Sequence, residues 1–327
     1  MCNGIMFIRA QTSLHLGTGS SVGAVDQPIQ RERCTGWPTG YGSSLKGALR
    51  DGYRVLLIND GKAADRQAAD EHPRLTTIFG PPRAQGSDHQ GALAITDARI
   101  MLYPVRSLKG LFAWVTCPAV IAQLGGALQL MGAGDTRPQV PDVAVEDALV
   151  HAGCSLVVPN QQQGQQGHLV LEDVALKART GQSEHALLAR WLRGALGIPE
   201  GAFDDPQQRL VIVNDDVFGY FVQHCTELTQ RVALDYDTKT AAGGALFTQE
   251  FLPPETVLYS VLLVEDPLPR TANGSDGLTS QMVVKEVEAI CQRPLQLGSN
   301  QTTGKGWCRL RVQTASAAAW PAQEVQS

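Results

Sequence analysis

Charged residues are scarce in this sequence, and positive charge is scarcer than negative. Of its 327 residues, 18% are charged, and 27 Lys and Arg stand against 32 Asp and Glu, for a formal charge of −5. Soluble domains average about a quarter charged residues, and nucleic-acid-binding domains usually carry a basic excess. The overall charge therefore argues against a nucleic-acid partner. With 43% hydrophobic residues, the chain can fold as one large domain or two ordinary ones, and a fully disordered chain is excluded.

Common cofactor, zinc and targeting motifs are also absent. The seven cysteines include no CxxC pair, which excludes the usual zinc frameworks and favours reduced thiols in a cytoplasmic protein. No GxGxxG follows a strand into a helix and no GxxxxGK[ST] occurs, which argues against Rossmann and P-loop folds. The first ten residues do not resemble a signal peptide. The uncharged stretch 110–134 contains Pro118, Gln123 and Gly125, so it predicts a strand and a helix, not a membrane span.

The sequence predicts strands and helices in irregular alternation. Strands are predicted at 5–16, 92–102, 111–116, 210–213, 256–264 and 307–312. Helices are predicted at 43–59, 118–131, 183–195, 215–225 and 281–291, with Ser43 and Ser44 capping the first and Asp215 capping the fourth. This pattern favours an α+β fold with antiparallel sheets and large insertions.

The remaining segments are expected to be hairpins and loops. Segments 226–236 and 245–251 are predicted to form the two arms of a hairpin, and 61–73 a helix end followed by a loop. The Gln-rich tract 161–166 is typical of an exposed hairpin tip or of disorder, and residues 314–327 are expected to form a flexible tail.

Two loops are rich in small residues. In the first, HLGTGSSVGAVD at 15–26, His15 precedes a Gly/Ser stretch that ends at Asp26. In the second, LGSNQTTGKGW at 297–307, Lys305 lies two residues before Trp307, an aromatic that can pack or stack on a base. Backbone N–H groups of such loops can approach a phosphate, because no side chain blocks them. For each loop alone, an ordinary polar loop or turn is the competing interpretation.

The predicted helix that begins near Gly42 offers a third feature of this kind. In GSSLKGALR at 42–50, free N–H groups at the helix start favour an anion. Lys46, Arg50 and Arg54 are spaced four residues apart and therefore form one basic stripe. A helix with both properties is suited to contact a phosphate backbone, although a solvated charged face is an equal alternative.

Taken together, these segments resemble the RAMP superfamily of CRISPR proteins. The resemblance is most specific to the repeated backbone subunit of the type III-B Cmr effector complex. The matching segments are LHLGTGSSVGAVDQPIQRER (14–33), GSSLKGALR (42–50), IFGPP (78–82), GALAITDARIMLYPVRSLKGLFAWVTCP (91–118), ALFTQEFLPPET (245–256) and LQLGSNQTTGKGWCRL (295–310).

The resemblance implies a fold and a set of partners. It implies a single domain over 1–313, with a ferredoxin-like, RRM-type palm, helical insertions and a β-hairpin thumb within 226–251. Copies of such a subunit stack into a filament along the CRISPR guide RNA with other Cmr subunits. The thumbs flip out nucleotides of the bound single-stranded target RNA, and each copy cleaves it at a flipped position. The implied protein is an antiviral endoribonuclease in the cytoplasm, with no membrane partner.

The resemblance also implies site residues. It maps the catalytic aspartate onto Asp26, places His15 near the scissile phosphate, and matches Glu227 to a residue of the thumb. It implies that these positions bind RNA: Ser43, Ser44, Lys46, Arg50, Gly298, Lys305 and Gly306. Asp26 can accept the 2′-OH proton or hold a divalent metal ion, Mg or Mn.

The sequence leaves three alternative functions open. The chain can be a guide-binding backbone subunit without catalysis, the equivalent subunit of another type III subtype, or a guide-processing RAMP endonuclease. An unrelated metabolic enzyme is disfavoured because no cofactor motif is present.

The net charge is compatible with RNA binding if the Lys and Arg residues lie along one groove and the acidic residues lie elsewhere. The sequence predicts such a basic stripe from eight residues: Arg31, Arg33, Lys46, Arg50, Arg54, Arg106, Lys109 and Lys305.

Overall fold

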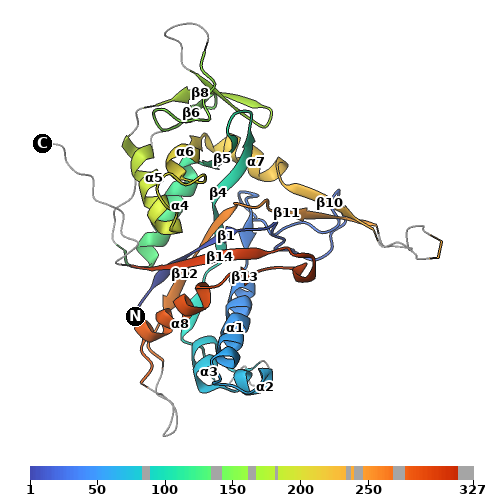
Figure 1. Cartoon of the computed structure of the whole chain (residues 1–327), viewed down its shortest axis with the longest axis vertical. Coiled ribbons are helices and arrows are strands. Elements are labelled where there is room, and N and C mark those ends of the chain that lie inside the picture. Colours follow the sequence, from blue (N-terminus) through green and yellow to red (C-terminus); the bar gives the residue numbers. More distant parts are fainter. Residues whose placement is uncertain are drawn as a thin grey trace, which may run out of the picture.

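The computed structural model describes residues 1–82, 89–133, 142–160, 167–180, 183–232, 237–238, 246–267 and 277–315. Figure 1 shows helices and strands mixed around one large sheet, with a two-stranded arm extending from it. The mixed α+β fold expected from the sequence is therefore confirmed. No helix within these ranges is long and apolar enough to cross a membrane.

Six elements form the first half of the large sheet and its main helices. In chain order they are β1 (Gly4–Ala10), α1 (Gly42–Asn59), β4 (Ala98–Ser107), β12 (Val257–Val264), α8 (Ser280–Cys291) and β14 (Trp307–Thr314). The strands lie in the order β14-β1-β12-β4, and every neighbouring pair is antiparallel. Three short strands extend this half: β2 (Thr39–Gly40) beside β4, β3 (Leu93–Ile95) beside β12, and β13 (Leu295–Gln296) beside β14.

A long insertion between β4 and β12 builds the second half of the sheet. It contributes β5 (Leu111–Thr116), α4 (Pro118–Leu130), β6 (Asp147–Leu149), β7 (His168–Leu171), β8 (Val174–Arg179), α5 (Ser183–Leu196), α6 (Pro206–Arg209), β9 (Leu210–Val213) and α7 (Asp215–His224). The strands continue from β4 in the order β5-β9-β6-β8-β7. In Figure 1 this half lies above the middle of the molecule, and α1 lies below it.

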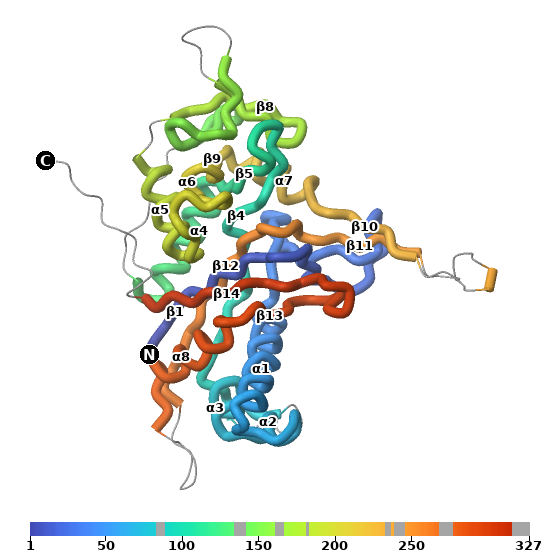
Figure 2. The backbone as a smooth tube through the Cα atoms, in the orientation of Figure 1, coloured from blue at the N-terminus to red at the C-terminus, as the bar shows by residue number. Residues whose placement is uncertain are grey.

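The insertion ends in the two-stranded arm. Strands β10 (Glu227–Arg231) and β11 (Phe247–Phe251) form a separate antiparallel sheet in which Glu227 is opposite Phe251. Figure 2 shows the pair extending to one side, next to the N-terminal loop that follows β1. Most of the link between the strands lies outside the described residues, as do the Gln-rich tract 161–166 and residues 316–327 of the tail.

Helix α1 is amphipathic, and its buried face packs on the core. Leu45, Leu49, Tyr53 and Leu57 recur every fourth residue and are all buried. On a neighbouring face, Gly52 allows close packing, because a Cβ there would lie 2.9 Å from side-chain atoms of α8 and β13. Two short helices, α2 (Arg66–Asp70) and α3 (Pro73–Phe79), also pack on α1. Helix α2 lies within 61–73, where a helix end and a loop were predicted, so the loop prediction is wrong there.

Two strand predictions have the wrong bounds. The first strand ends at Ala10, because the chain leaves the large sheet and pairs with the end of the arm through a bridge between Leu14 and Leu252. The segment 92–102 is two strands, and β4 continues through Pro104. Proline is tolerated there because the pairing of β4 with β12 stops at Leu102, which leaves only β5 beside Pro104.

Both predicted helix caps are wrong. Tyr41 is the N-cap of α1, and Asp97 replaces a side-chain cap by accepting a hydrogen bond from the Gly42 amide at 2.7 Å. The N-cap of α7 is Asn214, whose side chain accepts a hydrogen bond from the main-chain amide of Asp216. Asp215 instead accepts a hydrogen bond from the amide of Ala119 in the first turn of α4. The remaining helix predictions agree with α4, α5, α7 and α8 to within a few residues.

Candidate functional site

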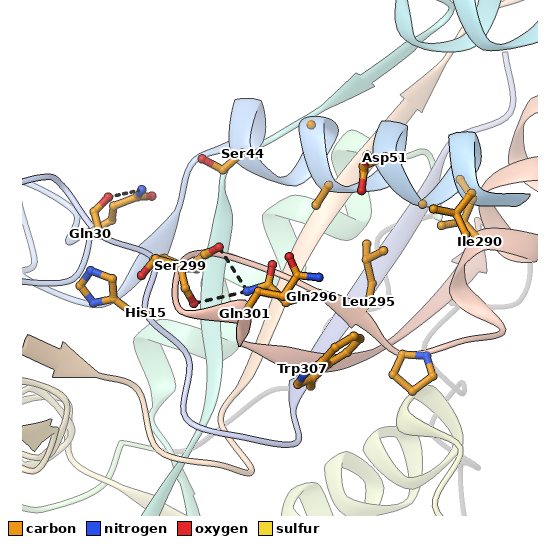
Figure 3. A pocket seen from close by; sticks show the side chains of 18 of the residues that line it. His15, Gln30, Ser44, Asp51, Ile290, Leu295, Gln296, Ser299, Gln301 and Trp307 are labelled. Carbon is orange, nitrogen blue, oxygen red and sulfur yellow. Dashed lines mark hydrogen bonds between the residues drawn. The ribbon is translucent and has the colours of Figure 1, made fainter. Parts of the chain in front are cut away.

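A groove of about 850 Å³ lies between α1 and the chain from the end of α8 to the start of β14. Figure 3 shows Ser44 and Asp51 on the α1 side, facing Ser299, Gln296 and Trp307 across the groove. One end is polar, with His15, Ser44 and Ser299, and the other is apolar, with Val55, Leu295 and Trp307. A groove of this size and mixed character can hold a nucleotide-sized part of a ligand.

The first turns of α1 line the groove with small residues. Ser44 and Gly47 are exposed there, and a Cβ on Gly47 would meet no atom within 4 Å. A glycine inside a helix costs about 0.5–1 kcal/mol relative to alanine, and packing does not require this one. The absence of a side chain instead lets a ligand approach the helix backbone closely.

The start of α1 is less open to an anion than its sequence indicates. The amides of Gly42, Ser44 and Leu45 already donate hydrogen bonds, the first to the carboxylate of Asp97 and the others to the carbonyl of Tyr41. The hydroxyls of Ser43 and Ser44 therefore provide the polar groups at this end of the helix, and both residues are exposed.

The basic side chains of α1 are largely bound by neighbours. Arg54 makes ion pairs with Asp51 and, at 2.6 Å, with Asp70, while Arg50 donates to the Gly80 carbonyl at 2.7 Å. Burial, followed by the charge of Arg50, lowers the pKa of Lys46. Among the described residues, only Lys46 of this stripe has no acidic partner.

The predicted continuous basic stripe is wrong. Arg31 pairs with Glu250 and Lys109 donates to a main-chain carbonyl, and the only Lys or Arg among the described groove-lining residues is Arg293. Two acids lie among these cations: Asp70 of α2 pairs with Arg50 and Arg54, and Glu250 of β11 pairs with Arg31. Small and polar groups therefore dominate the groove.

The Gly-rich loop at 297–306 is bound tightly to the residues after β1. Gly298 has a φ of +72°, and a Cβ there would lie 2.1 Å from the carbonyl oxygen of His15. The amide of Ser299 donates to that same carbonyl at 3.2 Å, and Lys305 Nζ donates to Ser13 Oγ at 2.9 Å. Glycine is therefore required at Gly298 for the two loops to touch.

His15 is buried where this loop meets the arm. Its Nδ1 lies 2.6 Å from the carbonyl oxygen of Glu250, so Nδ1 carries the proton in this contact. The other ring nitrogen lies beside Gly17, a residue that lines the groove. The ring also contacts Phe251, with the centroids 5.5 Å apart, and Lys305 Nζ lies 5.1 Å from the centre of the Phe251 ring.

Asp26 is exposed and is held by the same arm strand. Its Oδ2 accepts a hydrogen bond from the amide of Thr248 at 2.7 Å. The next residue, Gln27, donates to the carbonyl of Thr248 at 3.0 Å and accepts from the amide of Glu250 at 3.0 Å. The loop is thus attached alongside β11, and Asp26 Oδ1 is left toward solvent.

Glu227 completes the set of predicted catalytic residues. It is half-buried at the start of β10 and pairs with Phe251, so both side chains lie on one face of the arm. Glu227 is more than 200 positions from Asp26 and His15, yet each of the three residues is attached to β11 by a contact of its own. Among the described residues, no three His, Cys, Asp or Glu are grouped to hold a metal ion.

Glu250 is a candidate that no sequence motif indicated. The residue is 5% exposed, and its carboxylate accepts hydrogen bonds from Ile29, Arg31 and Thr226. The sequence offered one sign of its role, an acidic residue beside Phe251 inside a predicted strand. The hydrogen-bond partners of Glu250 lie up to 221 positions away and could not be read from the sequence.

A family model and two relatives match most of the chain. The family model of the RAMP superfamily matches residues 7–309. The CRISPR system Cmr endoribonuclease Cmr4 of Pyrococcus furiosus is 31% identical over 306 residues, which is 92% of each chain. The CRISPR system CMR subunit Cmr4 of Saccharolobus solfataricus is 22% identical, over 93% of this chain and 94% of the relative.

Solved structures show the same fold. The crystal structure of oligomeric Cmr4 from Pyrococcus furiosus has a TM-score of 0.67 and 27% identity, covering 96% of this chain and 99% of the other. A chain in the cryo-EM structure of type III-B Cmr-beta bound to cognate target RNA has a TM-score of 0.68 and 18% identity, covering 97% and 98%. With the family match and the 31% identical relative, these findings show that the chain belongs to the RAMP superfamily and, within it, to the Cmr4 family.

Proposed function

We propose that this chain is the repeated backbone subunit of a type III-B CRISPR effector complex, where it binds guide RNA and cleaves the paired target RNA. The observation that carries the proposal is the attachment of Asp26, His15 and Glu227 to one strand beside a groove. The name of the 31% identical relative, an endoribonuclease of the Cmr system, supports the same activity. The partners are the guide RNA, single-stranded target RNA, further copies of this chain and other Cmr subunits.

The fold supports a palm and a thumb. The order β14-β1-β12-β4, with α1 and α8 connecting strands of this half, is that of a ferredoxin-like palm. The arm formed by β10 and β11 extends from it as the thumb. In a filament, successive thumbs displace a target nucleotide at regular intervals, and the displaced nucleotide brings its phosphate to the Asp26 loop.

The groove holds the RNA strand. The Ser44 hydroxyl and the helix backbone at Gly47 approach phosphates, because small residues leave room for them. Gly298 and Gly306 let the loop pack closely, since a Cβ on either would lie 2.1 Å from a main-chain carbonyl oxygen. Arg293 supplies positive charge in the groove, Ser43 and Lys46 add polar and charged groups on the same helix beside it, and Trp307, which is 37% exposed, stacks on a base or ribose. Arg50 and Lys305 act mainly by shaping the two walls, since each is bound to a neighbouring group.

Cleavage follows from the positions of Asp26 and His15. The 2′-oxygen attacks the adjacent phosphorus while the bond to the 5′-oxygen breaks, which leaves a 2′,3′-cyclic phosphate and a 5′-hydroxyl. Asp26 Oδ1 accepts the 2′-OH proton, and His15, when protonated, gives the proton at Nε2 to the departing 5′-oxygen. Displacing the nucleotide from the stack makes the in-line geometry possible, so positioning supplies much of the acceleration.

A divalent metal ion fits this site only together with RNA. Asp26 is a single carboxylate, which suits Mg or Mn bound mainly by water and phosphate oxygens. Such an ion would stabilise the negative charge that develops on the phosphate.

The test is target cleavage by the reconstituted complex. We expect a ladder of cuts at regular spacing, ends that carry a cyclic phosphate, and loss of cleavage when EDTA removes divalent ions. Intact target in the presence of the wild-type complex would instead support a guide-binding subunit without catalysis. Cutting of precursor guide RNA by the isolated chain would support the guide-processing alternative.

A further inference from the structure

Glu250 is a buried acid whose side-chain hydrogen bonds join the loop after β1 to the base of the arm. Oε2 accepts from the amide of Ile29 at 3.0 Å. Oε1 accepts from Arg31 Nη2 at 2.6 Å and from Thr226 Oγ1 at 2.9 Å. A buried carboxylate is destabilising unless it is paired and hydrogen-bonded, and here three donors and one opposite charge satisfy it.

The main chain of the same residue makes two more contacts with the site. Its carbonyl accepts from His15 Nδ1 at 2.6 Å, and its amide donates to the carbonyl of Gln27 at 3.0 Å. Gln27 follows Asp26 and Thr226 precedes Glu227, so one residue is bonded to His15 and to a chain neighbour of each other candidate. No other described residue joins all three.

We propose that Glu250 is a positioning residue for RNA cleavage. Through Ile29, Arg31 and Thr226 it fixes the Asp26 loop and the base of the thumb relative to the His15 ring. The inference rests on the proposed function, because it concerns the same site. Its physical basis is that the exposed carboxylate of Asp26 is held by the amide of Thr248, so the position of Asp26 depends on the backbone that follows it.

Arg31 extends this network away from the site. Besides Glu250, it donates to the carbonyls of Gly36 and Val222, each at 2.9 Å. Val222 lies in α7, directly before the arm. Removing the negative charge of Glu250 therefore leaves Arg31 without its acid and loosens the contact between loop and arm, while the groove walls are untouched.

The experiment compares Glu250→Gln with Glu255→Gln in the reconstituted complex. Glu255 is a matched control, because it is also an Arg-paired glutamate near the end of β11, but its partner is Arg9, outside the groove. We measure guide and target binding, thermal melting, and the single-turnover rate at saturating target. Glu250→Gln is expected to keep target affinity within about twofold and to lower the cleavage rate about 10- to 100-fold, as a small misplacement of reacting groups does. Glu255→Gln is expected to keep the wild-type rate.

A double variant separates positioning from general destabilisation. If Glu250 acts through Asp26, Glu250→Gln adds no further loss to Asp26→Asn, whereas independent effects would multiply. A wild-type rate in Glu250→Gln, or a loss no larger than the loss of binding, overturns the proposal. If Glu250→Gln does not assemble, Glu250→Asp keeps the charge but withdraws it by one methylene, and the same criteria apply. A wild-type rate in Asp26→Asn would instead contradict the proposed function itself.

Discussion

The loop between β1 and β2 has two parts with opposite character. The anchored part, residues 13–17 and 27–31, is mostly buried and is bonded to β11 and to the Gly-rich loop. The exposed part, residues 18–26, has exposed side chains at every position except Val25 and carries Asp26 at its end. The fold therefore fixes the two ends of the loop and leaves the carboxylate of Asp26 accessible to a ligand.

The anchored part should be far more sensitive to added atoms than the exposed part. Gly298→Ala places a Cβ against the His15 carbonyl at a positive φ, so we expect destabilisation by about 3 kcal/mol or more. Gly23→Ala is the control, since a Cβ there would meet only Ser21 Oγ at 3.7 Å, and its effect should stay within about 0.5 kcal/mol. Chemical unfolding of the purified chain measures both. Equal losses would show that the two parts are not different.

The anchored part also carries the one predicted catalytic ring. His15→Gln keeps a polar side chain but removes the ring nitrogen beside Gly17, so we expect cleavage to fall about 100-fold with little change in RNA affinity. Single-turnover kinetics with the assembled complex provides the measurement. A loss of RNA binding as large as the loss of rate would assign His15 to structure alone.

The opposite, apolar end of the groove should affect binding and not the rate. Trp307→Ala is expected to weaken guide binding about 10-fold, because stacking on a base contributes about 1–3 kcal/mol. Trp307→Phe should restore most of it. The main-chain hydrogen bonds that Trp307 makes with Gln11 and Thr12 are kept in both variants. Binding titrations with a fluorescent guide measure the effect. An unchanged affinity in Trp307→Ala would show that Trp307 does not stack on the RNA.

Lys46 should give the smallest effect, visible as a pH dependence. Burial and then Arg50 lower its pKa, while a bound phosphate favours the charged form. Raising the pH toward this lowered pKa removes the proton, so guide affinity should fall by a few-fold at a pH below 10.5, the ordinary lysine value. Lys46→Arg, which stays charged, should flatten the profile. The control Lys62→Arg, at an exposed lysine paired with Asp60, should not alter it.

Much of the fold could be predicted because local signals agree with it. Pro118 begins α4, and the apolar spacing of α1 matches its buried face. Strands β6, β7 and β8 have three to six residues each, in or next to a region with little periodicity, so no pattern pointed to them. The first strand was predicted too long, because the pairing of Leu14 with Leu252 cannot be read from nearby residues.

The site could be predicted only in part, for a related reason. The resemblance proposes Asp26 and His15, and the four-residue spacing places Lys46, Arg50 and Arg54 along one helix. The pairing of Asp70 with Arg50 and Arg54 was missed because α2 was expected to be a loop. Glu250 was missed because its role depends on contacts with residues more than 200 positions away.

The most direct test of the central claim is a paired measurement on complexes assembled with the wild-type chain or with Asp26→Asn. Equilibrium binding of target RNA and its single-turnover cleavage are measured in the same buffer with a divalent ion. We expect equal target affinity in the two complexes and a cleavage rate lowered by about 100-fold or more in Asp26→Asn. Cleavage by the variant at the wild-type rate would contradict the catalytic role of Asp26.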